Sequence, residues 1–144
     1  MAPYNFQLLL KFLLEHGVTW APDQEIIYRD QFRYTYQQMY RRVLKLASAL
    51  EGISVGKGTL VGVMEWDSHR YLEMYFGIPG SGAVLHMINP RLAVENIVYT
   101  MQKAADEVLI FHEDFLPLIR QIRPYLDSIK KYILISDSGQ TPDI

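Results

Sequence analysis

Three of the four histidines, His69, His86 and His112, lie at or just after the end of a short apolar run. Imidazole is the commonest metal ligand in proteins, so a metal centre is the first chemistry to consider. Metal sites usually show a fixed ligand spacing, such as H-E-x-x-H on one helix. A single histidine at each of three separate positions has no such spacing, and we do not predict a metal site.

A Gly-Lys-Gly stretch at residues 56–58 raises the question of a phosphate loop. That loop has the pattern G-x-x-x-x-G-K-[ST] and follows a strand. Here the spacing from Gly52 to Gly56 is one residue short, Gly58 stands where Ser or Thr is required, and a predicted strand comes after it. We interpret the stretch as a turn. The pattern G-x-G-x-x-G is absent, and residues 80–82 do not fit G-x-S-x-G.

Four apolar runs separated by helical patterns begin 24 residues apart, at Leu60, Val84, Val108 and Tyr132. Strands that alternate with helices predict an α/β fold with a parallel sheet. The runs at 60–64 and 83–88 lack polar alternation, so we expect strands that are covered on both faces. We predict a partial three-layer α/β fold with a mostly parallel sheet.

Polar residues follow the predicted carboxyl ends of the strands, where open parallel sheets bind ligands. They are Glu65, Trp66, Asp67, Ser68, His69, His86, Asn89, Arg91, His112, Glu113, Asp114, Ser136 and Asp137. Many also suit structural roles: Asp67 or Ser68 as a helix cap, and Asn89 as a turn residue. Two interpretations stay open, loop stabilisation or the wall of a substrate tunnel or subunit interface, for Trp66, His69, His86, Asn89 and Arg91.

The N-terminal part predicts a leading helix over 5–16, capped by Asn5 and stopped by Gly17, and then a hairpin of strands 25–29 and 31–34. A helix follows from Thr35, where Gln38 completes a capping-box spacing, and ends at Gly52. Its expected buried stripe is Tyr36, Met39, Tyr40, Val43, Leu44, Ala47 and Leu50. The apolar leading helix either packs on the domain or binds a membrane surface or a partner.

We divide the chain into a leading helix and linker (1–21), an α/β region (22–137) and a polar tail (138–144). A net charge of −2 with interspersed acids and bases gives no footprint for nucleic acid. The chain has no cysteine, which fits a reducing compartment, and no apolar run long enough for a transmembrane segment. We expect a soluble, cytoplasmic protein.

Residues 65–92, EWDSHRYLEMYFGIPGSGAVLHMINPRL, resemble the N-terminal region of AMP-forming acyl-CoA synthetases of the adenylate-forming superfamily. The patterns W-x-x-H-R-x-L-E-x-Y-F and G-A-V-L-H-x-x-N-P-R-L are most similar to medium- and long-chain fatty acid CoA ligases. Residues 26–50 are similar to the opening hairpin and helix of that family, and residues 96–111 to the helix and strand after the N-P-R-L loop. The resemblance covers residues 22–137.

The resemblance implies a two-step reaction, in which a fatty acid carboxylate attacks the α-phosphate of ATP and the thiol of coenzyme A then displaces AMP. Mg²⁺ offsets the phosphate charge. The phosphate-gripping loop, the nucleotide-binding motifs, the hinge and the catalytic lysine of the family have no counterpart in these 144 residues. We therefore expect an N-terminal fragment that is inactive alone and binds neither ATP, Mg²⁺ nor coenzyme A, and we assign no catalytic residue.

Two alternatives to the ligase fragment are retained. The first is a self-standing, non-catalytic binding or interaction module derived from the same fold. The second, a small flavodoxin-like nucleotide-binding protein, ranks last because no phosphate loop follows the first parallel strand. Whether the protein forms a homodimer is left open.

Overall fold

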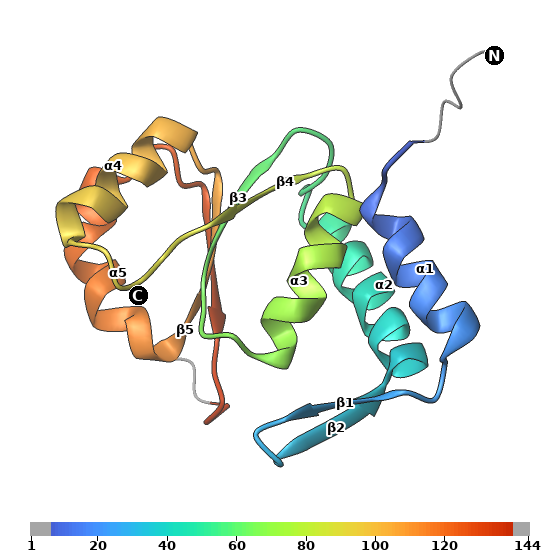
Figure 1. Cartoon of the computed structure of the whole chain (residues 1–144). Helices are drawn as coiled ribbons and strands as arrows, with labels where there is room; N and C mark the ends of the chain where they lie inside the picture. The colour runs from blue at the N-terminus through green and yellow to red at the C-terminus, as the bar shows by residue number, and fades with distance from the viewer. Residues whose placement is uncertain (1–6, 140–144) are drawn as a thin grey trace.

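A parallel sheet lies between layers of helices in the computed structural model, which describes residues 7–139 (Figure 1). The strand order is β4-β3-β5-β6, and every neighbouring pair is parallel. The strands are β3 (Leu60–Met64), β4 (Val84–Met87), β5 (Val108–His112) and β6 (Lys131–Ile135). The prediction of a partial three-layer α/β fold is confirmed.

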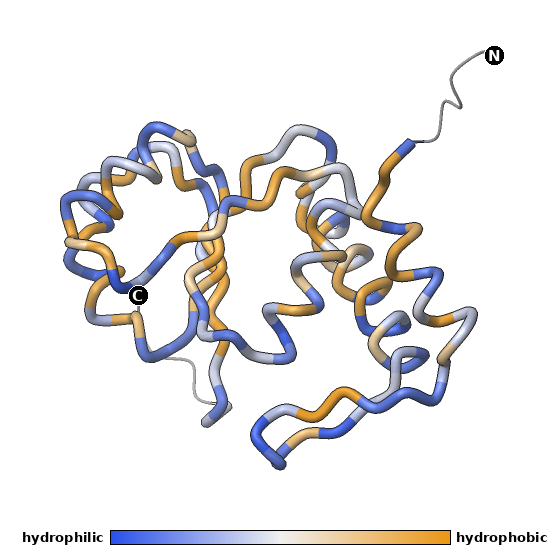
Figure 2. Tube along the Cα trace, viewed as in Figure 1, coloured by the Kyte–Doolittle hydropathy of each residue, from blue (hydrophilic) through white to orange (hydrophobic). Residues whose placement is uncertain are grey.

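Each face of the sheet packs against its own helices. One core cluster joins Val61, Val63 and Ile110 of the sheet to α3 (His69–Gly80) and to the end of α2 (Tyr36–Gly52). The other joins Leu109 and Phe111 to α4 (Val94–Ala104) and α5 (Leu116–Ile122). Figure 2 shows hydrophobic residues concentrated along these central strands, as expected of a sheet covered on both faces.

The positions of the strands agree with the predicted 24-residue rhythm. Three strands begin at the expected residues, and β6 begins one residue early, at Lys131. The prediction that both of the first two runs are covered on both faces is right for β3 and wrong for β4. Because β4 is an edge strand, Val84 is 48% and Met87 54% exposed. The Gly56–Gly58 stretch forms the predicted turn, in which the amide of Thr59 donates to the carbonyl of Gly56.

The predicted hairpin and long second helix both form, although the first strand ends one residue early and the second lies one residue later than predicted. Strands β1 (Glu25–Tyr28) and β2 (Phe32–Thr35) pair antiparallel, and Arg29 and Asp30 turn the chain with positive φ angles of 49° and 54°. The capping box at the start of α2 is complete. The Gln38 amide donates to the Thr35 hydroxyl (3.2 Å), and the Thr35 amide donates to the Gln38 side chain (2.8 Å).

The leading helix differs from its prediction. Helix α1 (Leu10–Trp20) begins at Leu10 and passes through Gly17, which therefore does not stop it. The predicted cap Asn5 lies outside the described residues. Gly17 serves a different purpose, because a Cβ there would lie 3.2 Å from the ring of Tyr36 on α2. A close approach of two helices, not a helix end, explains this glycine.

Helix α1 packs on α2 and α3 through Leu14, which joins a third core cluster with Tyr34, Met39 and Val43. Its outer side keeps Leu13 67% and Trp20 76% exposed. Leu44 of α2, which was expected in the buried stripe, is 52% exposed. Among the described residues, no helix has the length and apolar character needed to cross a bilayer.

The capping box gives a test of local folding. We expect Thr35→Ala to lower the free energy of unfolding by about 1 kcal/mol, because the Gln38 amide loses its acceptor. Chemical denaturation measures the change. The control is Thr19→Ala, whose hydroxyl bonds the carbonyl of Glu15 one turn back on α1. Equal stability of Thr35→Ala and the unaltered protein would contradict the role of the cap.

Candidate functional site

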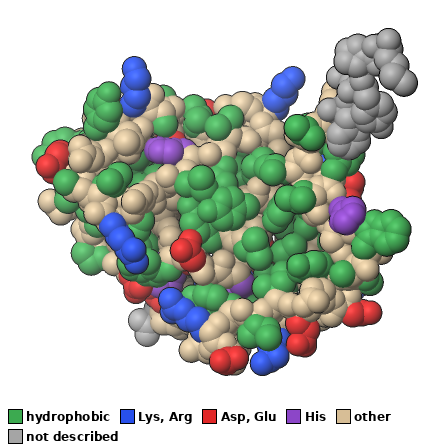
Figure 3. Space-filling view, in the orientation of Figure 1, with side chains coloured by type: hydrophobic (Ala, Val, Ile, Leu, Met, Phe, Trp, Pro, Cys, Tyr) green, Lys and Arg blue, Asp and Glu red, His purple; other side chains and the backbone are tan. Residues whose placement is uncertain are grey.

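A polar hollow of about 280 Å³ lies at the carboxyl ends of β3 and β4, the edge at which open parallel sheets bind ligands. We call it the rim hollow. Its lining residues come from the loop after β3, from α3 and from the end of β4: Glu65, Trp66, Asp67, Tyr71, Tyr75 and residues 87–91. Figure 3, drawn in the same orientation as Figure 1, shows hydrophobic side chains gathered across the middle of the visible face, over α3 and β4.

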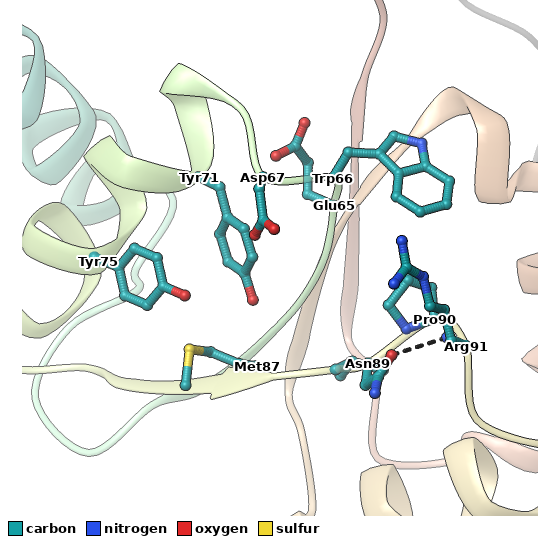
Figure 4. A pocket seen from close by; sticks show the side chains of 10 residues that line it. Glu65, Trp66, Asp67, Tyr71, Tyr75, Met87, Asn89, Pro90 and Arg91 are labelled. Carbon is teal, nitrogen blue, oxygen red and sulfur yellow. Dashed lines mark hydrogen bonds between the residues drawn. The ribbon is translucent and has the colours of Figure 1, made fainter. Parts of the chain in front are cut away.

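The structure brings three of the five predicted positions together at this hollow. Trp66, Asn89 and Arg91 line it, whereas His69 and His86 do not. Asn89 forms the expected turn, because its side-chain oxygen accepts a hydrogen bond from the amide of Arg91 at 3.0 Å. In Figure 4 the Arg91 side chain lies beneath the Trp66 indole, across the hollow from Tyr71 and Tyr75.

The indole of Trp66 is fixed by residues that follow β5. Its Nε1 donates to the carboxylate of Asp114 at 2.8 Å, and its ring packs on Phe115 with centroids 4.7 Å apart. A charge-assisted hydrogen bond and a ring contact together restrict the indole to one orientation. The wall of the hollow beside Arg91 is therefore preformed.

A buried carboxylate closes the hollow near the start of α3. Glu65 is 4% exposed and accepts a hydrogen bond from the Ser68 hydroxyl at 2.8 Å. Burial raises the pKa of Glu65, and the Ser68 bond opposes that shift. Ser68 also caps α3 by accepting from the amides of Arg70 and Tyr71. Of the two residues considered for this cap, Ser68 forms it.

Two stacked tyrosines form the α3 side of the hollow. The rings of Tyr71 and Tyr75 lie 5.0 Å apart and nearly parallel. Burial, followed by the effect of Tyr75, raises the pKa of Tyr71 to about 12, so its hydroxyl keeps its proton at neutral pH. The hollow thus offers tyrosine hydroxyls, an amide, a guanidinium and a carboxylate, which are groups that hydrogen-bond polar ligands.

Leu85 of β4 packs against the core cluster on the α3 side of the sheet. Because alternate residues of a strand face opposite ways, His86 points to the α4 side. Its Nδ1 lies 2.7 Å from the carboxylate of Asp106, which is fully buried. The second oxygen of Asp106 is buried and has no hydrogen-bond partner in the part of the chain that the structure describes. Gly62 leaves space for this pair, since a Cβ there would lie 3.0 Å from the Asp106 carboxylate.

The other two histidines of the predicted strand ends, His69 and His112, occupy separate environments. His69 begins α3 and packs against the aromatic rings of the hairpin. His112 accepts a hydrogen bond from the amide of Asp114 at Nδ1, and its Nε2 lies 3.4 Å from Asp137. Among the described residues, no three His, Asp or Glu side chains are grouped to hold a metal ion.

One network at the rim could not be recognised from the sequence. Glu113 accepts hydrogen bonds from the Ser136 hydroxyl at 2.6 Å and from the amides of Asp137 and Ser138. These bonds, with that from Ser136 the strongest, lower the pKa of Glu113 to about 2. Arg70 binds Asp137 at 2.6 Å. The loop after β6 is thereby tied to β5 and α3.

A second sequence feature needed the structure to interpret. Residues 52–56, Gly-Ile-Ser-Val-Gly, match the G-x-S-x-G pattern of a nucleophilic serine. Ser54 has a positive φ of 63°, yet it lies between the end of α2 and the start of β3. The nucleophile elbow requires a strand before the serine and a helix after it. Here the order is reversed, so Ser54 terminates a helix.

An open parallel sheet with a polar hollow at its carboxyl edge is the arrangement of a ligand-binding α/β enzyme domain. Comparison of the sequence with known proteins identifies the family. The chain belongs to the AMP-binding enzyme family, which matches residues 14–143. The resemblance seen in residues 22–137 is confirmed.

Two curated relatives align over 137 residues, or 92% of this chain. One is a long-chain-fatty-acid–CoA ligase of Thermus thermophilus, 34% identical, and the other a medium-chain-fatty-acid–CoA ligase of Ectopseudomonas oleovorans, 31% identical. The chain spans 25% of the length of each. A solved anthranilate CoA ligase bound to anthranoyl-AMP is 28% identical, with a TM-score of 0.79 over 86% of this chain and 24% of its own. A fatty acyl CoA synthetase of Mycobacterium tuberculosis shares the fold, with a TM-score of 0.80 over 86% of this chain, 26% of its own and 23% identity.

The buried pair gives a prediction for stability. We expect His86→Leu to lower the free energy of unfolding by about 3 kcal/mol, because Asp106 is left buried without its partner. The double variant His86→Leu/Asp106→Leu should recover most of this loss, since it removes both polar groups. Urea denaturation at pH 7 compares the variants, with His16→Leu on the exposed side of α1 as control. A single variant as stable as the double one would contradict the pairing.

Gly62 allows a separate test of the space around this pair. Gly62→Ala would place a Cβ 2.9 Å from Ile88 and 3.0 Å from the Asp106 carboxylate. We expect it to lower the free energy of unfolding by about 1–3 kcal/mol through overpacking. The matched control is Gly52→Ala, where no atom lies within 4 Å of the added Cβ. If both alanines were tolerated equally in thermal unfolding, the close packing described here would be wrong.

Proposed function

We propose that this chain forms the N-terminal part of an AMP-forming ligase that joins a fatty acid to coenzyme A through an acyl-adenylate. The alignment with the two fatty acid CoA ligases over 92% of the chain carries this proposal. The substrates would be small molecules: the fatty acid, ATP and coenzyme A, with Mg²⁺ as the metal ion. Since the chain spans a quarter of those relatives, the complete activity is a property we assign to the longer protein.

We propose that ATP and Mg²⁺ bind to parts of the longer protein outside the described residues. The described residues contain no group of three acidic or histidine side chains that could hold a metal ion. The Gly-Lys-Gly turn lies before β3, and the amide of Gly58 donates to the carbonyl of Gly82 just before β4. That turn is at the amino edge of the sheet, opposite the rim hollow.

The contribution that we propose for this chain is a preformed wall. Trp66, Asn89 and Arg91 line the rim hollow. Asp114 holds the indole of Trp66, and the hydrogen bond from the Arg91 amide to the Asn89 side chain holds the turn. We propose that this wall borders a substrate tunnel or an interface of the complete enzyme. His69 and His86 face other parts of the structure and are not included. We also propose a cytoplasmic location, in keeping with the absence of cysteine from the sequence.

One observation favours a second candidate function, a non-catalytic interaction module. The outer side of α1 leaves Leu13 and Trp20 largely exposed, and apolar exposure of this kind often marks a contact surface. A self-standing module would be monodisperse and unfold cooperatively. An incomplete domain would self-associate or bind hydrophobic dyes.

The deciding experiment compares this chain with the product of its coding frame read past Ile144. We expect fatty acid-dependent exchange of pyrophosphate into ATP by the longer product and none by the 144-residue chain. Exchange by the short chain would contradict the fragment assignment. A stop codon after Ile144, or a longer product that activates no fatty acid, would overturn the ligase proposal.

The role of the wall is tested in the active longer protein by Asn89→Ala. Weakened acyl turnover at an unchanged melting temperature would support a tunnel wall. A lowered melting temperature with normal turnover would show that Asn89 acts only as a turn residue. Thr19→Ala, far from the rim on α1, is the control for nonspecific effects.

A further inference from the structure

The imidazole of His69 forms the main aromatic contact between the hairpin and α3. Its ring centroid lies 4.2 Å from Phe32, 5.5 Å from Tyr28 and 6.2 Å from Tyr34. Those three rings belong to β1 and β2, whereas His69 is the first residue of α3. The hairpin therefore packs against α3 around the imidazole of His69.

This environment disfavours a charged imidazole. The Nδ1 atom of His69 is buried and has no hydrogen-bond partner among the described residues. Burial, then the nearby guanidinium groups of Arg70 and Arg42, lower the pKa of His69 to about 4, and Asp137 opposes them. Asp137 is already bound to Arg70 at 2.6 Å, so its charge is largely compensated.

The other charged and titratable groups around His69 do not favour its protonation. From the hairpin, the Tyr28 and Tyr34 rings face it, and burial raises the pKa of Tyr34 to about 12. On α3, Glu73 is committed to Arg42 at 2.6 Å. Asp67 shares with His69 the lining of the hollow beside the hairpin. It has no hydrogen bond or ion pair to His69.

Aromatic rings can stabilise cations, which would favour an imidazolium. Here the guanidinium of Arg42 already lies over the ring of Phe32, 5.4 Å from its centroid. A second cation at the same ring would be repelled by the first. Desolvation and the two arginines therefore outweigh the aromatic attraction.

We propose that His69 is an acid-sensitive latch: neutral, it holds the β1–β2 hairpin against α3, and protonated, it releases the hairpin. Release would open the hairpin hollow, a space of about 290 Å³ lined by Ile26, Ile27 and Tyr28 of β1 together with Tyr71 and Tyr75 of α3. The same two tyrosines line the rim hollow. The latch therefore connects the hairpin to the site, independently of which reaction the longer protein performs.

The sign of the pH dependence follows from linkage. The released hairpin exposes His69 with a pKa near its ordinary 6.5, whereas the docked form has a lowered pKa. The released form therefore binds the proton more tightly. Docking is at full strength above pH 6.5 and is lost as the pH falls toward 4, with the opening constant rising by up to about tenfold per pH unit.

Hydrogen exchange of the backbone amides tests the latch in the intact chain. Protection of the β1 and β2 amides, corrected for intrinsic exchange, is measured between pH 7 and pH 4.5 against the amides of β5. We expect hairpin protection to fall at least tenfold while β5 changes less. His69→Phe keeps the aromatic packing without a titrating nitrogen, so its hairpin protection should not depend on pH. His16→Phe, on the exposed side of α1, should behave like the unaltered protein.

Three outcomes would overturn the proposal. Hairpin protection could stay constant down to pH 4.5, or His69→Phe could lose protection in acid as the unaltered protein does. The third is a directly titrated His69 resonance with a pKa near 6.5 in the unaltered protein. This last measurement needs no variant, so it decides the question even if His69→Phe does not fold.

Discussion

The ion pair between Arg42 and Glu73 fixes the relative position of α2 and α3, on which the rest of the structure depends. The two charged atoms lie 2.6 Å apart, and the Glu73 side chain is 8% exposed. A carboxylate buried to this extent is tolerated when its charge is paired, so few other alignments of the helices are available. Gly77 permits the close approach, since a Cβ there would lie 2.8 Å from Leu46 of α2. The same arginine lies over Phe32 and so extends the contact to the hairpin.

With α3 held in this way, its first turn organises the carboxyl edge of the sheet. Ser68 caps the helix and binds Glu65, while Arg70 reaches Asp137 after β6. Tyr71 places its ring in the wall shared by the rim hollow and the hairpin hollow. A shift of α3 would therefore move both hollows together. The hairpin and the rim are thus separated by one shared wall on α3.

Local patterns in the sequence were enough to predict most of the secondary structure. The Thr35–Gln38 capping box and the 24-residue strand rhythm depend on neighbours along the chain, and both are confirmed. The boundaries of α1 were not predictable in this way. Gly17 resembles a helix stop, but its packing against Tyr36 of another helix decides the outcome. The division into parts at residues 21 and 137 stays a prediction.

The contacts that build the site depend on residues far apart in the sequence. Trp66 and its partner Asp114 are 48 positions apart, and Arg42 and Glu73 are 31 apart. The position of His86 within β4 could not be predicted either. In a short apolar run the sequence does not show which residue ends the strand. The rim could therefore be located from the sequence as a set of strand ends, but its pairings could not.

Most of the polar side chains at the carboxyl edge of the sheet bind other side chains of this chain. Glu65, Glu113, His86 and His112 all bind other side chains of the chain, as do Arg70 and Asp137. Groups paired in this way hold the loops of this edge in place. At the rim hollow, the charged side chains of Asp67 and Arg91 have no hydrogen bond or ion pair within residues 7–139. Most of the charged groups at this edge therefore bind one another, whereas the side chains of Asp67 and Arg91 line the hollow without such a bond among the described residues.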